Sequence, residues 1–214
     1  MKDVVRKVLL TCVLFVGVMS LSAQLSQHGL VLNGGLGRVG SKSNQLGVRL
    51  DEIDYKVGLS LGYRFRFNKP TFKTFHYDLD INAGVKSARP TKWNVEEWTD
   101  EDGNIYIAAY GGSTGAAFSY TSIGFTANYS FFKNLSVGLG VEPACHFKAA
   151  EIGNSFDMPV VAKIAYNLKV VEVGIYGKYG LVNVFEMDYL KSGKIREIQL
   201  SLFIPFKARE IKNR

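Results

Sequence analysis

The sequence predicts an all-β fold, an eight-stranded antiparallel up-and-down transmembrane β-barrel. After residue 23, eight segments alternate apolar and polar residues with the period of two that is typical of strands. Their connections are alternately very short and long, as in barrels that cross a membrane. Glycine lies mainly on the polar face, whereas aromatic residues gather near strand ends on the apolar face.

Residues 1–23 are predicted to be a secretory signal peptide, cleaved after Ala23. Basic residues come first, then an apolar run, then small residues: Lys2, Arg6 and Lys7, Val8 to Val18, and Leu21, Ser22 and Ala23. The run falls short of the about 20 apolar residues that a spanning helix needs, although an N-terminal membrane anchor is the alternative. Cys12 lies inside the apolar core, so it is a poor lipid-attachment site.

The mature chain is expected to form one domain, with the barrel over 24–206 and a short periplasmic tail over 207–214. Cleavage after Ala23 leaves 23 basic and 18 acidic residues, a modest net charge of +5. Only Cys145 survives cleavage, so an intramolecular disulfide is excluded and the backbone hydrogen-bond ladder must supply the rigidity.

The alternation is clearest over 55–67, where apolar and aromatic residues at odd positions oppose glycine, serine and basic residues at even positions. Glycine at position 34 interrupts the apolar face of the first segment, which is the weakest of the set. The predicted strands cover 28–38, 55–67, 75–85, 123–131, 135–141, 158–168, 171–181 and 197–206.

The connections predict an orientation. Tight turns are expected around 68–70, 133–134 and 167–170, because turn-forming residues stand there with little spare chain. Longer and more polar loops are expected over 39–54, 87–117, 148–155 and 184–194. Barrels of this kind have short periplasmic turns and long external loops, so both mature termini are expected in the periplasm.

Alternation alone leaves open which face is inside, and a soluble barrel of the lipocalin type would turn its apolar face inward. Glycines on the polar face lie beside long side chains such as Arg64, Lys163 and Lys178, as a narrow eight-stranded interior requires. The aromatic residues suit interfacial girdles: Phe65, Phe67, Phe75, Tyr77, Tyr129, Phe131, Tyr166 and Phe206. Both features favour the membrane barrel.

With these features the chain resembles the small outer-membrane barrels of the OmpA/OmpX type. The segment 197–206 is similar to the closing strand with a terminal aromatic that the outer-membrane assembly machinery recognises, although 207–214 extends past Phe206. The export end together with the barrel is similar to outer-membrane β-barrel proteins of Bacteroidota. The resemblance implies residence in the outer membrane of a Gram-negative-type bacterium and leaves the activity open.

The polar face is expected to form a salt-bridged interior, because an isolated ion in a narrow lumen is costly. Such a network fills the lumen with side chains and predicts negligible conduction; the alternative is an ion or proton path. The candidate interior residues are Arg64, Arg66, Asp78, Asp80, Glu142, Lys163, Glu172, Lys178 and Glu197.

Enzyme-like motifs are weak, and we expect no cofactor and no metal site. The G-x-G-x-x-G match at 35–40 lacks the following helix that a dinucleotide-binding fold needs. His146 has Glu142, Glu151 and Ser155 nearby in sequence, and lipid A deacylases are barrels that use serine, histidine and an acid, so a lipid A-modifying enzyme is an alternative. Cys145 has an outward phase, which favours a small apolar filler.

The longest loop is the candidate external binding loop. Asp102 and Gly103 between two short segments predict a small hairpin standing above the membrane. Carboxylates at its tip could ligate calcium, but a solvated turn is favoured because a complete oxygen-ligand loop is longer. Aromatic residues beside acids suit recognition of a partner. The candidate binding residues are Trp93, Glu96, Trp98, Asp100, Asp102, Tyr106 and Tyr110.

The favoured function is a non-enzymatic barrel that stabilises the envelope or displays this loop. An accessory component of a secretion or envelope-assembly complex and the lipid A-modifying enzyme are the alternatives. Expected partners are outer-membrane lipid or lipopolysaccharide and an envelope or surface protein. Nucleic acid is excluded, because the basic residues are dispersed without a recognition motif.

Overall fold

The computed structural model describes residues 24–40, 53–69, 72–90, 94–110, 116–132, 134–147, 155–184 and 194–206. The predicted signal peptide over 1–23 and the tail over 207–214 lie outside these described residues. Within them, no helix is long and apolar enough to cross a membrane.

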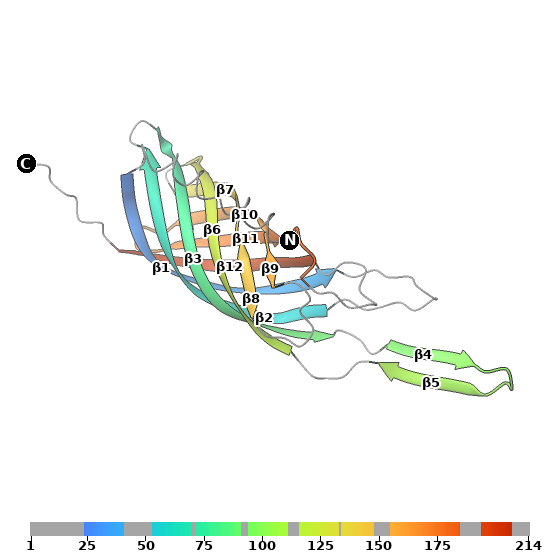
Figure 1. Cartoon of the computed structure of the whole chain (residues 1–214). Coiled ribbons are helices and arrows are strands. Elements are labelled where there is room, and N and C mark those ends of the chain that lie inside the picture. Colours follow the sequence, from blue (N-terminus) through green and yellow to red (C-terminus); the bar gives the residue numbers. More distant parts are fainter. Residues whose placement is uncertain are drawn as a thin grey trace, which may run out of the picture.

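The described chain forms a closed antiparallel barrel (Figure 1). Eight strands, here called staves, form the wall in the order β3-β2-β1-β12-β11-β10-β7-β6. Pairing of β6 with β3 closes the ring. This confirms the predicted fold class. The strands are β1 (Gln24–Gly40), β2 (Ile53–Lys69), β3 (Phe72–Pro90), β4 (Asn94–Thr99), β5 (Ile105–Tyr110), β6 (Ala116–Ser130), β7 (Leu135–Val141), β8 (Ala144–Phe147), β9 (Phe156–Asp157), β10 (Val160–Asn167), β11 (Glu172–Tyr179) and β12 (Lys194–Phe206).

Two prolines interrupt neighbouring staves at the same level. β8 continues the stave of β7 beyond Pro143, and β9 precedes β10 before Pro159. Proline has no N–H to donate to the ladder, so each strand breaks there. The carbonyls still accept, because Ile123 N donates to Pro143 O at 3.0 Å and Glu142 N donates to Pro159 O at 2.9 Å. The wall therefore remains continuous.

Several strands are longer than the alternation predicted. β1 extends over Gln24–Gly40 instead of 28–38, and β12 begins at Lys194 instead of 197. The extra residues of β12 are still paired, as exposed Arg196 opposite Arg38 shows. The apolar alternation ends where the wall no longer faces an apolar environment. The backbone pairing of the strands continues beyond that point, because it does not depend on apolar surroundings.

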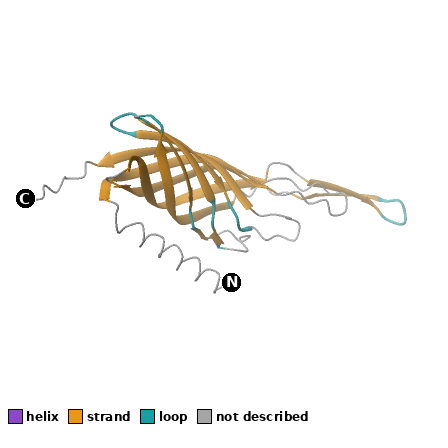
Figure 2. Ribbon diagram, turned by 90° about the horizontal axis from the view of Figure 1, so that it is seen from above, coloured by secondary structure: helices purple, strands orange, loops and turns teal. Residues whose placement is uncertain are grey.

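The two ends of the barrel differ (Figures 1 and 2). His28 near the start of β1 pairs with Phe206 at the end of β12, so both described termini lie at one end. The turn after β10 lies at that end, where Asn167 Oδ1 accepts from Lys169 N at 2.8 Å and Lys169 has a φ of 73°. The β4–β5 hairpin projects from the opposite end. It pairs only with itself, so it adds no staves to the barrel.

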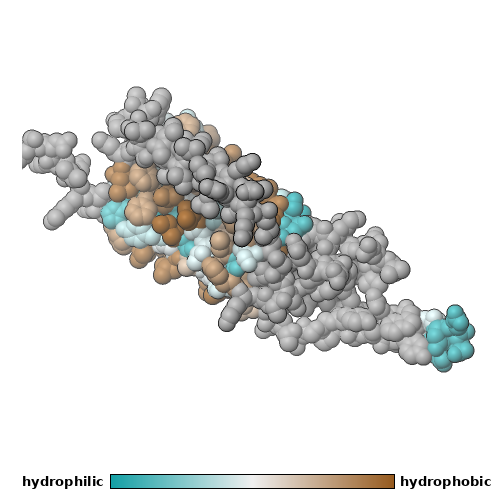
Figure 3. Space-filling model, in the orientation of Figure 1, coloured by the Kyte–Doolittle hydropathy of each residue, from teal (hydrophilic) through white to brown (hydrophobic). Residues whose placement is uncertain are grey.

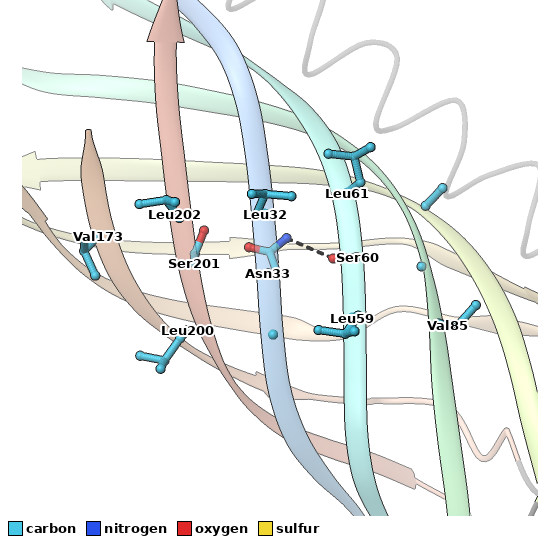
Figure 4. A pocket seen from close by; sticks show the side chains of 13 residues that line it. Leu32, Asn33, Leu59, Ser60, Leu61, Val85, Val173, Leu200, Ser201 and Leu202 are labelled. Carbon is cyan, nitrogen blue, oxygen red and sulfur yellow. Dashed lines mark hydrogen bonds between the residues drawn. The ribbon is translucent and has the colours of Figure 1, made fainter. Parts of the chain in front are cut away.

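The wall has an apolar outside and a polar inside. Outward leucines are half exposed, as at Leu32 (45%) and Leu59 (56%), whereas the next residues, Asn33 and Ser60, are buried and hydrogen-bonded to each other at 3.0 Å (Figure 4). Small residues at Gly34 and Ala83 leave a shallow recess of about 680 Å³ among the outward leucines. Brown apolar atoms dominate much of the visible described wall in Figure 3.

Glycine on the inner face makes room for large side chains. A Cβ added to Gly84 would stand 2.8 Å from the Tyr120 ring, and one added to Gly180 would stand 2.6 Å from Asp157 Oδ2. At the turn end, rings pack together on the outer face: the Tyr63 and Phe65 centroids lie 5.0 Å apart, and those of Phe75 and Tyr129 also 5.0 Å. Such an aromatic belt suits a membrane–water interface.

Candidate functional site: the charged lumen and the external hairpin

All nine candidate interior residues face inward, and each is at most 8% exposed. They gather into two groups along the lumen. The turn-end cluster contains Arg64, Arg66, Asp78, Asp80, Lys163 and Glu172. The loop-end cluster contains Glu142, Lys178 and Glu197 together with Lys86.

Arg64 joins both sides of the turn-end cluster. Its Nε and Nη2 donate to the two carboxylate oxygens of Asp80, each at 2.7 Å, on the adjacent strand β3. Its Nη1 donates to Glu172 Oε1 at 3.1 Å, and Nη2 also contacts the Tyr176 hydroxyl. One fully buried guanidinium thereby connects β2, β3 and β11.

Asp78 and Glu172 are the shared acceptors of this cluster. Arg66 binds Asp78 through Nε at 2.7 Å and Glu172 through Nη1 at 2.7 Å. Lys163 Nζ lies 2.7 Å from Asp78 Oδ2 and 3.2 Å from Glu172 Oε1. Each of the two carboxylates therefore compensates more than one cation.

Several of these bonds cross the lumen. β2 and β11 are separated in the ring by β1 and β12, yet Arg64 and Arg66 of β2 both reach Glu172 of β11. β10 and β3 are separated by β7 and β6, yet Lys163 reaches Asp78. Since Arg64, Lys163 and Asp78 are 0–2% exposed, the cross-section at this level is filled by paired charges.

Aromatic rings complete the packing around the turn-end cluster. Arg64 Cζ lies 4.9 Å and Arg66 Cζ 5.1 Å from the centroid of the Phe203 ring. Lys163 Nζ lies 5.5 Å from the centroid of Tyr176. Cation–π contacts of this kind offset part of the desolvation of the buried cations.

The loop-end cluster consists of separate pairs. Lys178 Nζ lies 2.7 Å from Glu142 Oε2, and Ser122 Oγ donates to Glu142 Oε1 at 2.7 Å. Lys86 pairs with Glu197 across the lumen from β3 to β12, and Gln199 Nε2 donates to Glu197 Oε2 at 2.8 Å. Each carboxylate here compensates one cation.

Five residues that take part in the two clusters are absent from the predicted network: Lys86, Ser122, Tyr176, Gln199 and Phe203. Lys86 shares the even-numbered phase of Asp78 and Asp80 on β3. Tyr176 and Phe203 are 5% and 1% exposed and also stand on inward phases. Strand phase alone would have placed all five inside.

The enzyme candidates do not assemble among the described residues. His146 is 3% exposed and packs between the rings of Phe118 and Tyr120, at centroid distances of 5.6 and 6.0 Å. Neither of its ring nitrogens has a described hydrogen-bond partner, and its contact with Ser155 is a backbone bond of 2.7 Å to the carbonyl. Cys145 is exposed, in agreement with its outward phase. Glu151 lies outside the described residues.

The external hairpin has the turn that its sequence predicted. Gly103 has a φ of +84°, which glycine adopts without strain. Asp100 Oδ1 accepts from the backbone N of Asp102 at 3.0 Å and from that of Asn104 at 2.8 Å. The Asp100 carboxylate thus holds its own turn. The described parts of the chain contain no group of three or more metal-ligating side chains.

The hairpin register pairs several of the candidate binding residues across β4 and β5. Trp98 stands opposite Tyr106, and Tyr110 opposite Asn94, with Glu96 between them on β4. Trp93 lies outside the described residues.

No protein-family model matches this chain, and no curated protein sequence matches it. Among solved structures it is similar to Ail, the attachment invasion locus protein of Yersinia pestis, at 12% identity and a TM-score of 0.44, covering 86% of this chain and 100% of Ail. OprG of Pseudomonas aeruginosa aligns at 11% identity and a TM-score of 0.39, covering 87% of this chain and 99% of OprG. The Escherichia coli outer membrane protease OmpT aligns at 12% identity and a TM-score of 0.28, covering 84% of this chain and 93% of OmpT.

Structural similarities with these identities and TM-scores support no inference about activity. The fold is defined by the strand pairing itself. The ring of eight antiparallel staves, the apolar outside and the charged inside are the architecture of outer-membrane β-barrels.

Proposed function

We propose that this protein is a non-enzymatic outer-membrane barrel with a sealed lumen, which acts through its external hairpin and its envelope contacts rather than as a pore. The observation that carries the proposal is the turn-end cluster, whose ion pairs bridge opposite staves and leave no described central side chain exposed. Moving an ion through this level would require breaking several buried pairs, which is costly.

The outer face supports placement in a membrane. Along β1, His28 stands in the aromatic belt and exposed Arg38 stands ten residues further on. At about 3.3 Å per residue and a tilt of about 40°, this stretch rises about 25 Å, the height of the apolar band in outer-membrane barrels. On β12, Phe206 and Arg196 mark the same two limits.

A charge placed within this band tests the membrane placement. Leu32→Arg, near the middle of the band, is expected to cost about 2–4 kcal/mol of folding stability in lipid vesicles, and Leu36→Arg, near its edge, about 0–1 kcal/mol. Urea titration of the two variants in vesicles measures the difference. Equal losses of folding stability in the two variants would contradict the proposed depths of Leu32 and Leu36 in the membrane.

The hairpin is proposed to be external because it stands at the end away from the described termini, as in barrels with periplasmic termini. Its aromatic and acidic residues, which include Glu96, Trp98, Tyr106 and Tyr110, are the proposed partner-binding residues.

Deleting residues 94–110 tests this role. The barrel is expected to fold with its stability changed by less than about 0.5 kcal/mol, because the hairpin pairs only with itself. Binding of whole cells to host or neighbouring-cell surfaces, and cleavage of the hairpin by added protease, should be lost. If cells with the deletion variant still bound these surfaces as well as wild-type cells do, the display role would be contradicted. If added protease did not cleave the hairpin of the wild-type protein on whole cells, the proposed orientation would be contradicted.

Among the described residues no triad is assembled around His146, and this supports the non-enzymatic proposal over the lipid A-modifying alternative. The His146 ring has only aromatic packing among the described residues, with no described hydroxyl or carboxylate bonded to it. A general base needs such a bond to its nucleophile, directly or through a water molecule.

A further inference from the structure

We propose that the polar cup at the turn end of the lumen binds a small neutral solute that carries hydroxyl or amide groups. The cup has a volume of about 240 Å³ and is lined by the ends of staves around most of the ring. Its floor is formed by Arg66, Glu172 and His76. Its wall holds three serines and four amide side chains, Gln27, Asn68, Asn134 and Asn167.

The floor offers no spare charge to an ionic ligand. All three Arg66 nitrogens donate to Asp78 or Glu172, at 2.7–3.0 Å. Both Glu172 oxygens accept from arginine. The turn-end cluster contains three cations and three carboxylates, so its charges balance. A charged solute would lose hydration here without gaining a counter-charge.

Two side chains that line the cup carry buried polar atoms without described partners. His76 is 8% exposed, and its Nε2 has no hydrogen-bond partner among the described residues, since Asp78 Oδ2 is 3.9 Å away. Asn68 Oδ1 is likewise buried and without a described partner. An amide oxygen needs a donor, and a neutral imidazole nitrogen either donates or accepts. A hydroxyl or primary amide group of a solute satisfies both requirements once these two side chains turn toward it.

The size of the cup limits the ligand. At about 30 Å³ per water molecule, 240 Å³ corresponds to roughly eight waters, the space of a monosaccharide-sized solute. In the orientation proposed above the cup faces the periplasm, but its chemistry does not depend on that orientation.

Isothermal titration of the folded protein in detergent micelles with N-acetylglucosamine, which is neutral and carries hydroxyl and amide groups, tests the proposal. We expect saturable binding to one site, with glucosamine and glucuronate, its cationic and anionic counterparts, bound at least tenfold more weakly. Asn68→Ala should weaken binding at least fivefold. Ser130→Trp, which fills the cup, should abolish it. Asn104→Ala at the distant hairpin tip is the matched control and should bind as the wild type does.

Folding of each variant is checked by heat-dependent gel mobility and circular dichroism. The absence of saturable binding by the wild type would overturn the proposal and identify the cup as a water-filled vestibule. Undiminished binding by folded Ser130→Trp, or equal binding of the charged sugars, would overturn it as well. Because titration in micelles involves neither the hairpin nor conduction, these outcomes are independent of the proposed function.

Discussion

The turn-end and loop-end clusters are both built from buried charges in the same lumen, yet they differ in how many cations each carboxylate contacts. In the turn-end cluster, Asp78 and Glu172 each contact more than one cation. In the loop-end cluster, Glu142 and Glu197 each pair with a single lysine.

Unpartnered polar atoms lie beside both clusters. Both ring nitrogens of His146 near the loop end and Nε2 of His76 near the turn end are buried without a described hydrogen-bond partner. Within the two clusters, no side-chain nitrogen or oxygen of the charged residues is in that state. The difference therefore lies in connectivity, because a network that links several strands adds more rigidity than separate pairs do. The level near the turns is therefore the structural seal.

The largest expected effect comes from the most shared carboxylate. Asp78→Ala leaves Arg66 and Lys163 buried without their best partner, and removing one member of a buried pair costs about 3–5 kcal/mol. Urea unfolding in lipid vesicles, followed by far-ultraviolet circular dichroism, is the measurement.

Glu142→Ala in the loop-end cluster provides the contrast. It leaves one buried cation, Lys178, without its carboxylate, where Asp78→Ala affects two, so a loss near the lower end of the same range, about 3 kcal/mol, is expected. If Glu142→Ala destabilised the barrel as much as Asp78→Ala, the two clusters would be energetically equivalent and the comparison would fail.

The smallest effect is expected at His146. His146→Phe keeps an aromatic ring between Phe118 and Tyr120 and removes no described hydrogen bond of the ring, so stability should change by less than about 1.5 kcal/mol. The lipid A profile of cells producing the variant, read by mass spectrometry, should equal that of wild-type cells. A changed profile with an intact barrel would reveal a lipid-modifying role for this histidine.

Strand phase was the strongest information in the sequence, and it placed the charges correctly. Period two places Arg64, Arg66, Asp78 and Asp80 on one face, the positions of glycine and aromatic residues turn that face inward, and all four residues are buried. The partners of each charge could not be predicted in the same way. Arg64 reaches Glu172, 108 positions along the chain, and this contact depends on the closure and stagger of the ring.

Strand ends were the less predictable part of the fold. The alternating pattern reports only where the wall meets an apolar environment, so it missed the paired polar start of β12 at Lys194 and Arg196. The hairpin was better predicted, because Asp102-Gly103 determines a turn locally. The cup was not predicted at all, since its lining residues come from the ends of separate strands.

Single-channel recording from the purified protein in planar bilayers tests the sealed lumen most directly. Because Arg64, Lys163 and Asp78 are only 0–2% exposed across the lumen, we expect a current indistinguishable from that of the bare bilayer. A stable, ion-selective conductance from the wild-type protein would contradict it.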